Sequence, residues 1–135
     1  MTDRPQVCVG AIAISEGQLL LIQRGAPPDQ GRWSLPGGRV EGGELLAEAV
    51  VRELAEETRV EAVCGRFVGW VERFSEGTHL VILDFDVTVL GHQEPVAGDD
   101  AMGAGWIPLE HVAELDLVDG LAEFLAENHI IDTIV

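Results

Sequence analysis

Three glutamates lie close together near the end of a predicted helix. Glu53, Glu56 and Glu57 are three and four positions apart, so on an α-helix they share one face. Like charges repel there, and acids are disfavoured near the negative end of the helix dipole. A divalent cation would offset both costs, and oxygen ligands without His or Cys suit Mg²⁺ or Mn²⁺. The spacing thus indicates either a metal site or a solvated face on which the glutamates pair with Arg52.

A turn-forming stretch at residues 36–38, Pro-Gly-Gly, precedes this helix. Its glycines allow a tight turn and let backbone groups approach a ligand closely. Backbone carbonyl and amide groups that face a carboxylate-rich helix would cradle a metal ion and a diphosphate. Two glycines alone usually mark only a loop, so this interpretation depends on the helix that follows.

Together, residues 38–60 resemble the Nudix box, the motif of the Nudix hydrolase family. The box has the pattern G-x5-E-x7-R-E-U-x-E-E-x-G-U, in which U is a bulky aliphatic residue. Its fixed positions are filled here by Gly38, Glu44, Arg52, Glu53, Leu54, Glu56, Glu57 and Val60. The one departure is Arg59, which stands where the family has glycine. We expect Arg59 either to adopt the left-handed conformation of that glycine, at a cost of about 1 kcal/mol, or to extend or fray the helix end. Activity should be retained, because no metal-binding position is lost.

The resemblance implies a Nudix hydrolase, which uses Mg²⁺ or Mn²⁺ to hydrolyse nucleoside diphosphates linked to another group. Glu56 and Glu57 would bind the metal, and the carbonyl group of Gly37 would complete its ligands. Glu53 would bind metal or help to deprotonate the attacking water. Because a metal makes hydroxide available near neutral pH, water would attack phosphorus directly and no covalent nucleophile is needed.

The same resemblance assigns positioning and substrate-binding roles. Arg52 and Glu44 would pair and orient the helix and the loop, and Glu44 and Gly38 belong to the predicted substrate-binding residues. Arg24 and Arg39 flank the site and would hold phosphate oxygens, although each could equally be a surface charge. We favour Arg24, because it ends the strand that enters the loop.

The family often takes a further acidic group from a loop just before a tryptophan-containing strand. Asp99 and Asp100 precede Trp106 in this way, and we expect Asp100 to be the further metal ligand. An Asp-rich turn is an equal alternative. Arg32 is a further candidate for phosphate oxygens. Three aromatic side chains would stack on a base or, more commonly, lie in a core: Trp33, Trp70 and Phe74.

The composition limits the kind of partner. The 135 residues include 24 Asp and Glu against 8 Lys and Arg, which gives a formal charge of −16. Such a balance disfavours nucleic acids and anionic membranes as partners. We instead expect a small nucleotide substrate that binds together with a divalent cation. The chain shows neither a signal-peptide pattern nor an apolar run of about 18 residues, so we expect a cytoplasmic protein. The sequence leaves a homodimer open.

Strands and helices must position these residues. Apolar runs, turn residues and helical periodicity divide the chain into segments. Strands are predicted at 7–14, 19–24, 65–74, 79–90 and 106–107, helices at 44–58 and from an N-cap at Asp116 onward, and loops at 25–32 and 94–105. This order predicts a single α/β domain over residues 1–135 with a mixed sheet. The Nudix resemblance implies an α/β/α sandwich, with the mixed β-sheet between helices.

Three functions remain open. The first is a pyrophosphohydrolase that acts on a nucleotide sugar such as ADP-ribose, or on a nucleoside triphosphate. The second is an enzyme that removes oxidised triphosphates such as 8-oxo-dGTP. The third is a sensor that binds nucleotide without turnover, although the retained acids of the box argue against it. The chain lacks the downstream proline of the ADP-ribose subfamily and has no tyrosine, so the sequence leaves the substrate open.

Overall fold

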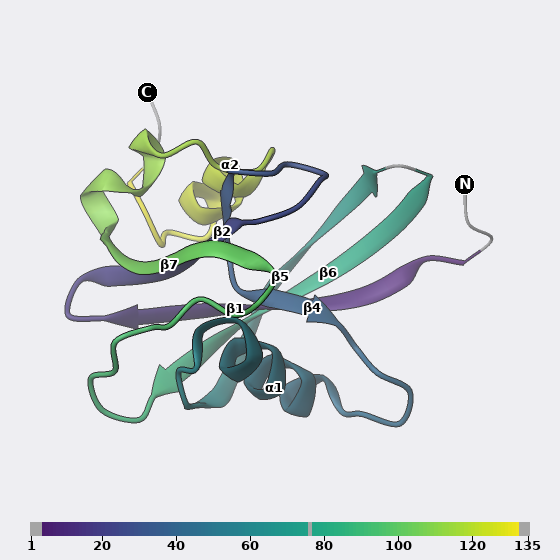
Figure 1. Cartoon of the computed structure of the whole chain (residues 1–135), viewed down its shortest axis with the longest axis horizontal. Coiled ribbons are helices and arrows are strands. Elements are labelled where there is room, and N and C mark those ends of the chain that lie inside the picture. The colour runs from purple at the N-terminus through teal and green to yellow at the C-terminus, as the bar shows by residue number, and fades with distance from the viewer. Residues whose placement is uncertain (1–3, 76, 133–135) are drawn as a thin grey trace.

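The structure is a computed structural model that describes residues 4–75 and 77–132 (Figure 1). The elements in chain order are β1 (Gln6–Ser15), β2 (Gln18–Arg24), β3 (Trp33–Ser34), β4 (Gly37–Arg39), α1 (Leu46–Thr58), β5 (Ala62–Ser75), β6 (Thr78–Val89), β7 (Ala101–Pro108), the 3₁₀ helix η1 (Leu109–Glu114) and α2 (Leu121–Glu127). Within the described residues, no helix is both long and apolar enough to span a membrane.

A mixed β-sheet forms the middle layer of the molecule. Its main path runs β3-β2-β1-β6-β5, with β4 paired to β1 and β7 paired to β2. β1 and β6 are parallel, whereas the other paired strands are antiparallel. Central parallel strands are covered on both faces, which explains why β1 is apolar at nearly every position and buried from residue 8 to residue 13.

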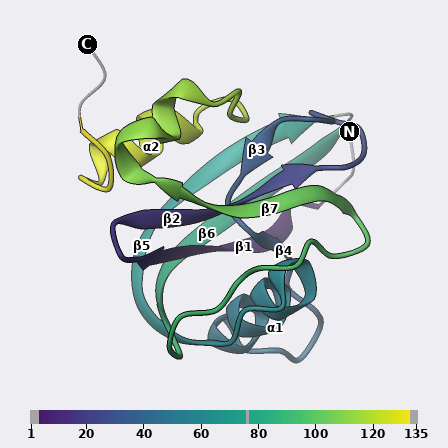
Figure 2. The ribbon, with the colours of Figure 1, turned by 60° about the vertical axis from the view of Figure 1, so that its left-hand side comes forward.

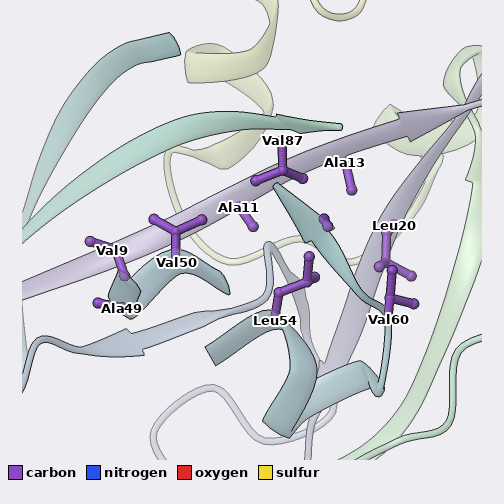
Figure 3. Packing of buried hydrophobic residues seen from close by; sticks show 10 residues of the cluster. Val9, Ala11, Ala13, Leu20, Ala49, Val50, Leu54, Val60 and Val87 are labelled. Atoms are coloured by element: carbon purple, nitrogen blue, oxygen red, sulfur yellow. The ribbon is translucent and has the colours of Figure 1, made fainter. Parts of the chain in front are cut away.

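Helices cover both faces of this sheet (Figures 1 and 2). On one face, α1 packs Val50 and Leu54 against β1 residues that include Val9 and Ala11 (Figure 3). On the other face, α2 and η1 close a second apolar cluster that contains Ile12, Leu19, Leu21, Val112, Leu121, Phe124 and Leu125. Neighbouring strand residues such as Ala11 and Ile12 enter different clusters, as the alternation of a strand requires. The three layers confirm the predicted α/β/α sandwich with a mixed sheet.

The structure corrects the predicted loop at 94–105. β7 begins at Ala101 and pairs with β2 as far as Pro108, so the Gly-rich stretch before Trp106 is a strand. Glycine has low strand propensity, but here the register with β2 holds the backbone. As a result, Asp100 stands directly at the start of a sheet strand.

The predicted start of the last helix was also wrong. α2 follows Gly120, whose φ is 83°, and Asp116 does not cap it. The Asp116 carboxylate instead lies 3.3 Å from the guanidinium of Arg32. The first helix also begins later than predicted, at Leu46, which leaves Glu44 in the loop and free to meet a helix residue.

Candidate active site

A cavity of about 480 Å³ brings most of the predicted site residues together. Its wall is formed by the end of β2, by β4, by the last turns of α1 and by the loop that leads into β7. The predicted residues in this wall are Arg24, Gly37, Gly38, Arg39, Glu53, Glu56, Glu57, Asp99 and Asp100. Glu44 and Arg52 are absent from the wall of this cavity, although both are described residues.

Glu57 is bound to the turn that precedes the helix. The backbone N–H of Gly37 donates a hydrogen bond of 2.7 Å to Glu57 Oε1. The pKa of Glu57 is raised to about 7, mainly by burial and also by the charges of Glu53 and Asp100, although the Gly37 hydrogen bond and Arg24 lower it. Since a nearby cation favours the ionised form of a carboxyl, a bound metal ion would strongly stabilise the ionised form of Glu57.

Arg52 connects the loop to the remaining acids. Its Nε and Nη2 donate to the two carboxylate oxygens of Glu44 at 2.6 and 2.8 Å. Its Nη1 donates to Glu53 at 2.7 Å and to Glu56 at 3.2 Å, and its Nη2 also donates to the carbonyl of Arg39 at 3.1 Å. The guanidinium lowers the pKa of Glu44 to about 2, so Glu44 stays ionised. The expected pair of Arg52 and Glu44 is therefore present, and it fixes the loop to the helix.

Two glycines allow the backbone to touch these acids. A Cβ atom at Gly38 would lie 2.7 Å from Glu53 Oε1, well inside contact distance. At Gly98, a Cβ atom would collide with the backbone carbonyl of Glu56. The N–H of Gly98 also donates to the carbonyl of Glu57 at 2.9 Å, which satisfies one of the free carbonyls at the helix end. This contact, which the sequence interpretation missed, holds the loop with Asp100 against the glutamates.

Arg59 takes the first of its two predicted conformations. It ends α1 with a φ of 60° and a ψ of 14°, in the left-handed region, and its N–H donates to the carbonyl of Ala55. The helix therefore stops where the family glycine would stop it. None of the acids is displaced from the cavity by this substitution.

The donors in the cavity match a hard divalent cation in type. Glu53, Glu56 and Glu57 supply carboxylate oxygens, without His or Cys among the predicted ligands. Across residues 4–75 and 77–132, no three acidic, His or Cys side chains are already gathered as a metal-binding cluster. Two of the carboxylates, Glu53 and Glu56, instead accept hydrogen bonds from the guanidinium of Arg52. The residues thus fit a metal ion in their chemistry, while in this structure two of them are hydrogen-bonded to Arg52.

Four other candidates lie away from this cavity. Arg32 pairs with Asp29, Asp116 and Asp119, at 3.3, 3.3 and 2.9 Å. Among the described residues, the cavity wall contains no aromatic side chain. Trp33 packs on the second apolar cluster, and the other two aromatic candidates are exposed on the sheet, Trp70 at 61% and Phe74 at 65%.

A second, smaller cavity of about 180 Å³ adjoins the first and shares part of its wall. It contains Asp84 and Arg73, which the sequence interpretation did not identify as site residues. Asp84 is only 3% exposed, although it alternates with apolar residues along β6 in a pattern typical of a solvated face. The alternation of acidic and apolar residues gave no signal for this burial, because only the folded sheet shows that the face of Asp84 is covered.

Comparisons with known proteins agree with this geometry. The sequence pattern of the NUDIX domain family matches residues 4–127. An ADP-ribose pyrophosphatase of Methanocaldococcus jannaschii is 38% identical over 82% of the chain and 66% of its own length. A Bacillus subtilis protein, provisionally named an 8-oxo-dGTP diphosphatase, is 36% identical over 71% of the chain and 62% of its own length. The chain thus spans less than two thirds of each relative. The crystal structure of a MutT protein from Methanosarcina mazei Go1 superimposes with a TM-score of 0.85 at 26% identity, covering 96% of this chain and 97% of that one.

Proposed function

The chain belongs to the NUDIX domain family, as its box predicted, and from this premise we propose that it is a Mg²⁺- or Mn²⁺-dependent pyrophosphohydrolase. Water would attack the diphosphate of a nucleotide directly. The observation that carries the proposal is the single cavity that gathers three box glutamates, two arginines and Asp100.

The acids of the cavity would hold the cation. Glu56 and Glu57 are the proposed first ligands, completed by the Gly37 carbonyl and by Asp100. Glu53 lies within the same wall and would act as a ligand or accept the proton of the attacking water. When bound, the cation would lower the pKa of a water ligand and neutralise charge on the diphosphate.

The arginines of the cavity would bind the diphosphate. Arg24 and Arg39 lie in the wall of the larger cavity, and their positive charge complements the negative charge of a diphosphate. The Nε of Arg24 donates to the carbonyl of Pro28 at 2.8 Å, which fixes the orientation of its guanidinium. Because Glu44 is held by Arg52, its predicted contribution to substrate binding is the placement of the loop that begins at Gly38.

Two substrates are candidates. ADP-ribose is suggested by the name of the Methanocaldococcus jannaschii relative, and 8-oxo-dGTP by that of the Bacillus subtilis relative. Chromatography of the products separates them, since ADP-ribose would yield AMP and ribose 5-phosphate, whereas a triphosphate would yield a monophosphate and pyrophosphate. A nucleotide that binds tightly without any product would instead favour the sensor.

The direct test of the proposal is Glu57→Gln, which preserves the shape of the side chain and removes its charge. We expect kcat to fall by at least about 100-fold with Mg²⁺ present, because the loss removes a carboxylate that would hold the cation. Glu127→Gln, an exposed change on α2, is the matched control and should leave kcat unchanged. Full activity of Glu57→Gln would exclude the proposed metal site.

A further inference from the structure

The second cavity lies between the sheet and the residues that lead into and form α2. It shares Arg24, Gly37, Gly38 and Glu57 with the active-site cavity, so a ligand held in one can extend into the other. Its apolar wall includes Val71, Leu80, Ile82, Val118, Leu121 and Phe124. A flat ring with apolar faces and polar edges fits such a wall better than a phosphate or a sugar does.

Asp84 supplies a carboxyl group to this cavity. Its side chain is 3% exposed, and Oδ1 has no hydrogen-bond partner among the described residues. The carboxyl lies over Gly10, where a Cβ atom would collide with Oδ1. Burial raises the pKa of Asp84 to about 7, and Arg73 only partly opposes this. A buried acceptor without a partner is costly, which indicates that a ligand supplies the missing donor.

Arg73 supplies the opposite chemistry to the same cavity. In the sheet, Arg73 pairs with Leu80 and Gly69 pairs with Asp84, so the two charged residues are four positions apart along β6, about 13 Å at the usual rise. Although both are described residues, they form no ion pair with each other. The cavity therefore has Asp84, which only accepts hydrogen bonds when it is ionised, and Arg73, which only donates them.

We propose that the second cavity binds the base of a guanine nucleotide, with Asp84 accepting hydrogen bonds from its N1–H and 2-amino groups and Arg73 donating to its O6 and N7. Guanine has two adjacent donors, N1–H and the 2-amino group, on one edge and two adjacent acceptors on another, whereas adenine, cytosine and uracil each lack a pair of adjacent donors. 8-Oxoguanine keeps the same donor edge for Asp84, but its N7 carries a hydrogen, so Arg73 would donate only to O6 of the oxidised base. The inference rests on the proposed function and selects guanine nucleotides, oxidised or not, as its substrate class.

The test compares nucleotides that differ in the donor edge alone. GTP and ITP differ only by the 2-amino group, so wild-type protein with Mg²⁺ should show a kcat/KM for GTP at least 10-fold above that for ITP and for ATP. Asp84→Asn replaces one acceptor by a donor without a change of shape, and it should lower kcat/KM for GTP by at least 10-fold and remove the preference over ITP. Asp86→Asn is the matched control, because Asp86 lies on the same strand, outside the cavity, beside Arg66.

A second measurement separates this inference from the proposed function. Equilibrium dialysis of metal-free protein should show tighter binding of GMP than of IMP or AMP, and Asp84→Asn should abolish the difference. If ADP-ribose is hydrolysed while GTP and ITP are equivalent, or if Asp84→Asn keeps the wild-type ratio, the guanine inference is overturned and the proposed function stands. If no nucleotide is hydrolysed but the GMP preference depends on Asp84, the inference stands and the proposed function fails. Should Asp84→Asn not fold, the wild-type GTP to ITP ratio decides alone.

Discussion

Arg59 ends the helix of the box in a conformation that favours glycine. Its φ of 60° places the Cβ atom near the following carbonyl, which costs an ordinary residue about 1 kcal/mol. The acids nevertheless keep their places in the cavity wall. The substitution therefore affects stability more than chemistry, and the two effects can be measured separately.

Arg59→Gly should stabilise the protein by about 0.5–1 kcal/mol, since the strain is removed while the unfolded chain becomes somewhat more flexible. Urea denaturation gives the free energy of unfolding, and kcat should not change. Arg59→Ala controls for loss of the side chain, because alanine keeps the strain. A gain of equal size in both variants would show that the guanidinium, rather than the backbone, is responsible.

Arg52 acts through geometry that another cation cannot reproduce. Its planar fork bonds both oxygens of Glu44 and reaches Glu53 and Glu56 as well. Lysine offers a single point charge, so Arg52→Lys should leave the loop and the acids poorly placed. We expect kcat/KM to fall about 10-fold or more with little change in secondary structure by circular dichroism. Arg66→Lys, at an 80% exposed side chain, is the control. An equal response of the two variants would argue against a positioning role for Arg52.

At the scale of elements, the end of α1 and the loop before β7 form one unit. The N–H groups of Val96 and Gly98 donate to the carbonyls of Thr58 and Glu57 at 2.8 and 2.9 Å, so the loop caps the helix. Such contacts satisfy carbonyls that the helix itself leaves free. These hydrogen bonds hold the loop beside the glutamates, and Asp100 at the end of the loop lies in the cavity wall.

Gly98→Ala tests this unit, because the added Cβ atom would collide with the carbonyl of Glu56. Displacement of the loop should destabilise the protein by about 1–3 kcal/mol and lower kcat. Gly42→Ala is the comparison, since a Cβ atom there meets nothing within 4 Å. Wild-type stability and activity in Gly98→Ala would mean that the loop shifts without consequence for the site.

The sequence predicted those elements in which one periodicity dominates. The apolar stripe of α1, with Val50 and Leu54, predicted the helix and placed its acids, because helix geometry alone fixes which residues share a face. The start of β7 and the role of Asp116 were predicted wrongly, since pairing with β2 and a contact with Arg32 decide them, and both are long-range. Asp84 was missed for the same reason: only the folded sheet shows that its face is covered.

At the scale of the whole molecule, the sheet joins two cavities of different character. Gly37, Gly10, Asp84 and Gly69 occupy matching register positions on β4, β1, β6 and β5. The side chains that line the larger cavity are mainly charged, and those that line the smaller one are mainly apolar. One row across the sheet therefore connects Gly37, in the wall of the larger cavity, to the buried acid Asp84.

This arrangement predicts how stability depends on pH. The pKa of Asp84 in the folded protein is about 7, above its ordinary value of 3.8, so the folded state holds a proton that the unfolded chain releases. The resulting contribution to stability is fully present below pH 3.8 and is lost as the pH rises through about 7. Asp84→Asn has no proton to lose, so it should be more stable than wild type at pH 8, by a few kcal/mol at most, and this advantage should shrink toward pH 4.

Urea denaturation of the metal-free proteins at pH 4, 6 and 8 measures this difference directly. Asp86→Asn should follow the wild-type profile, because Asp86 is partly exposed beside Arg66. Titration of the other acids, Glu57 included, is common to wild type and variant and cancels in the comparison. Parallel profiles for wild type and Asp84→Asn would show that Asp84 is not buried as an unsatisfied acid. A difference in the free energy of unfolding between Asp84→Asn and wild type that appears above pH 6 and disappears when GMP is added would instead show that bound GMP offsets the cost of the ionised Asp84.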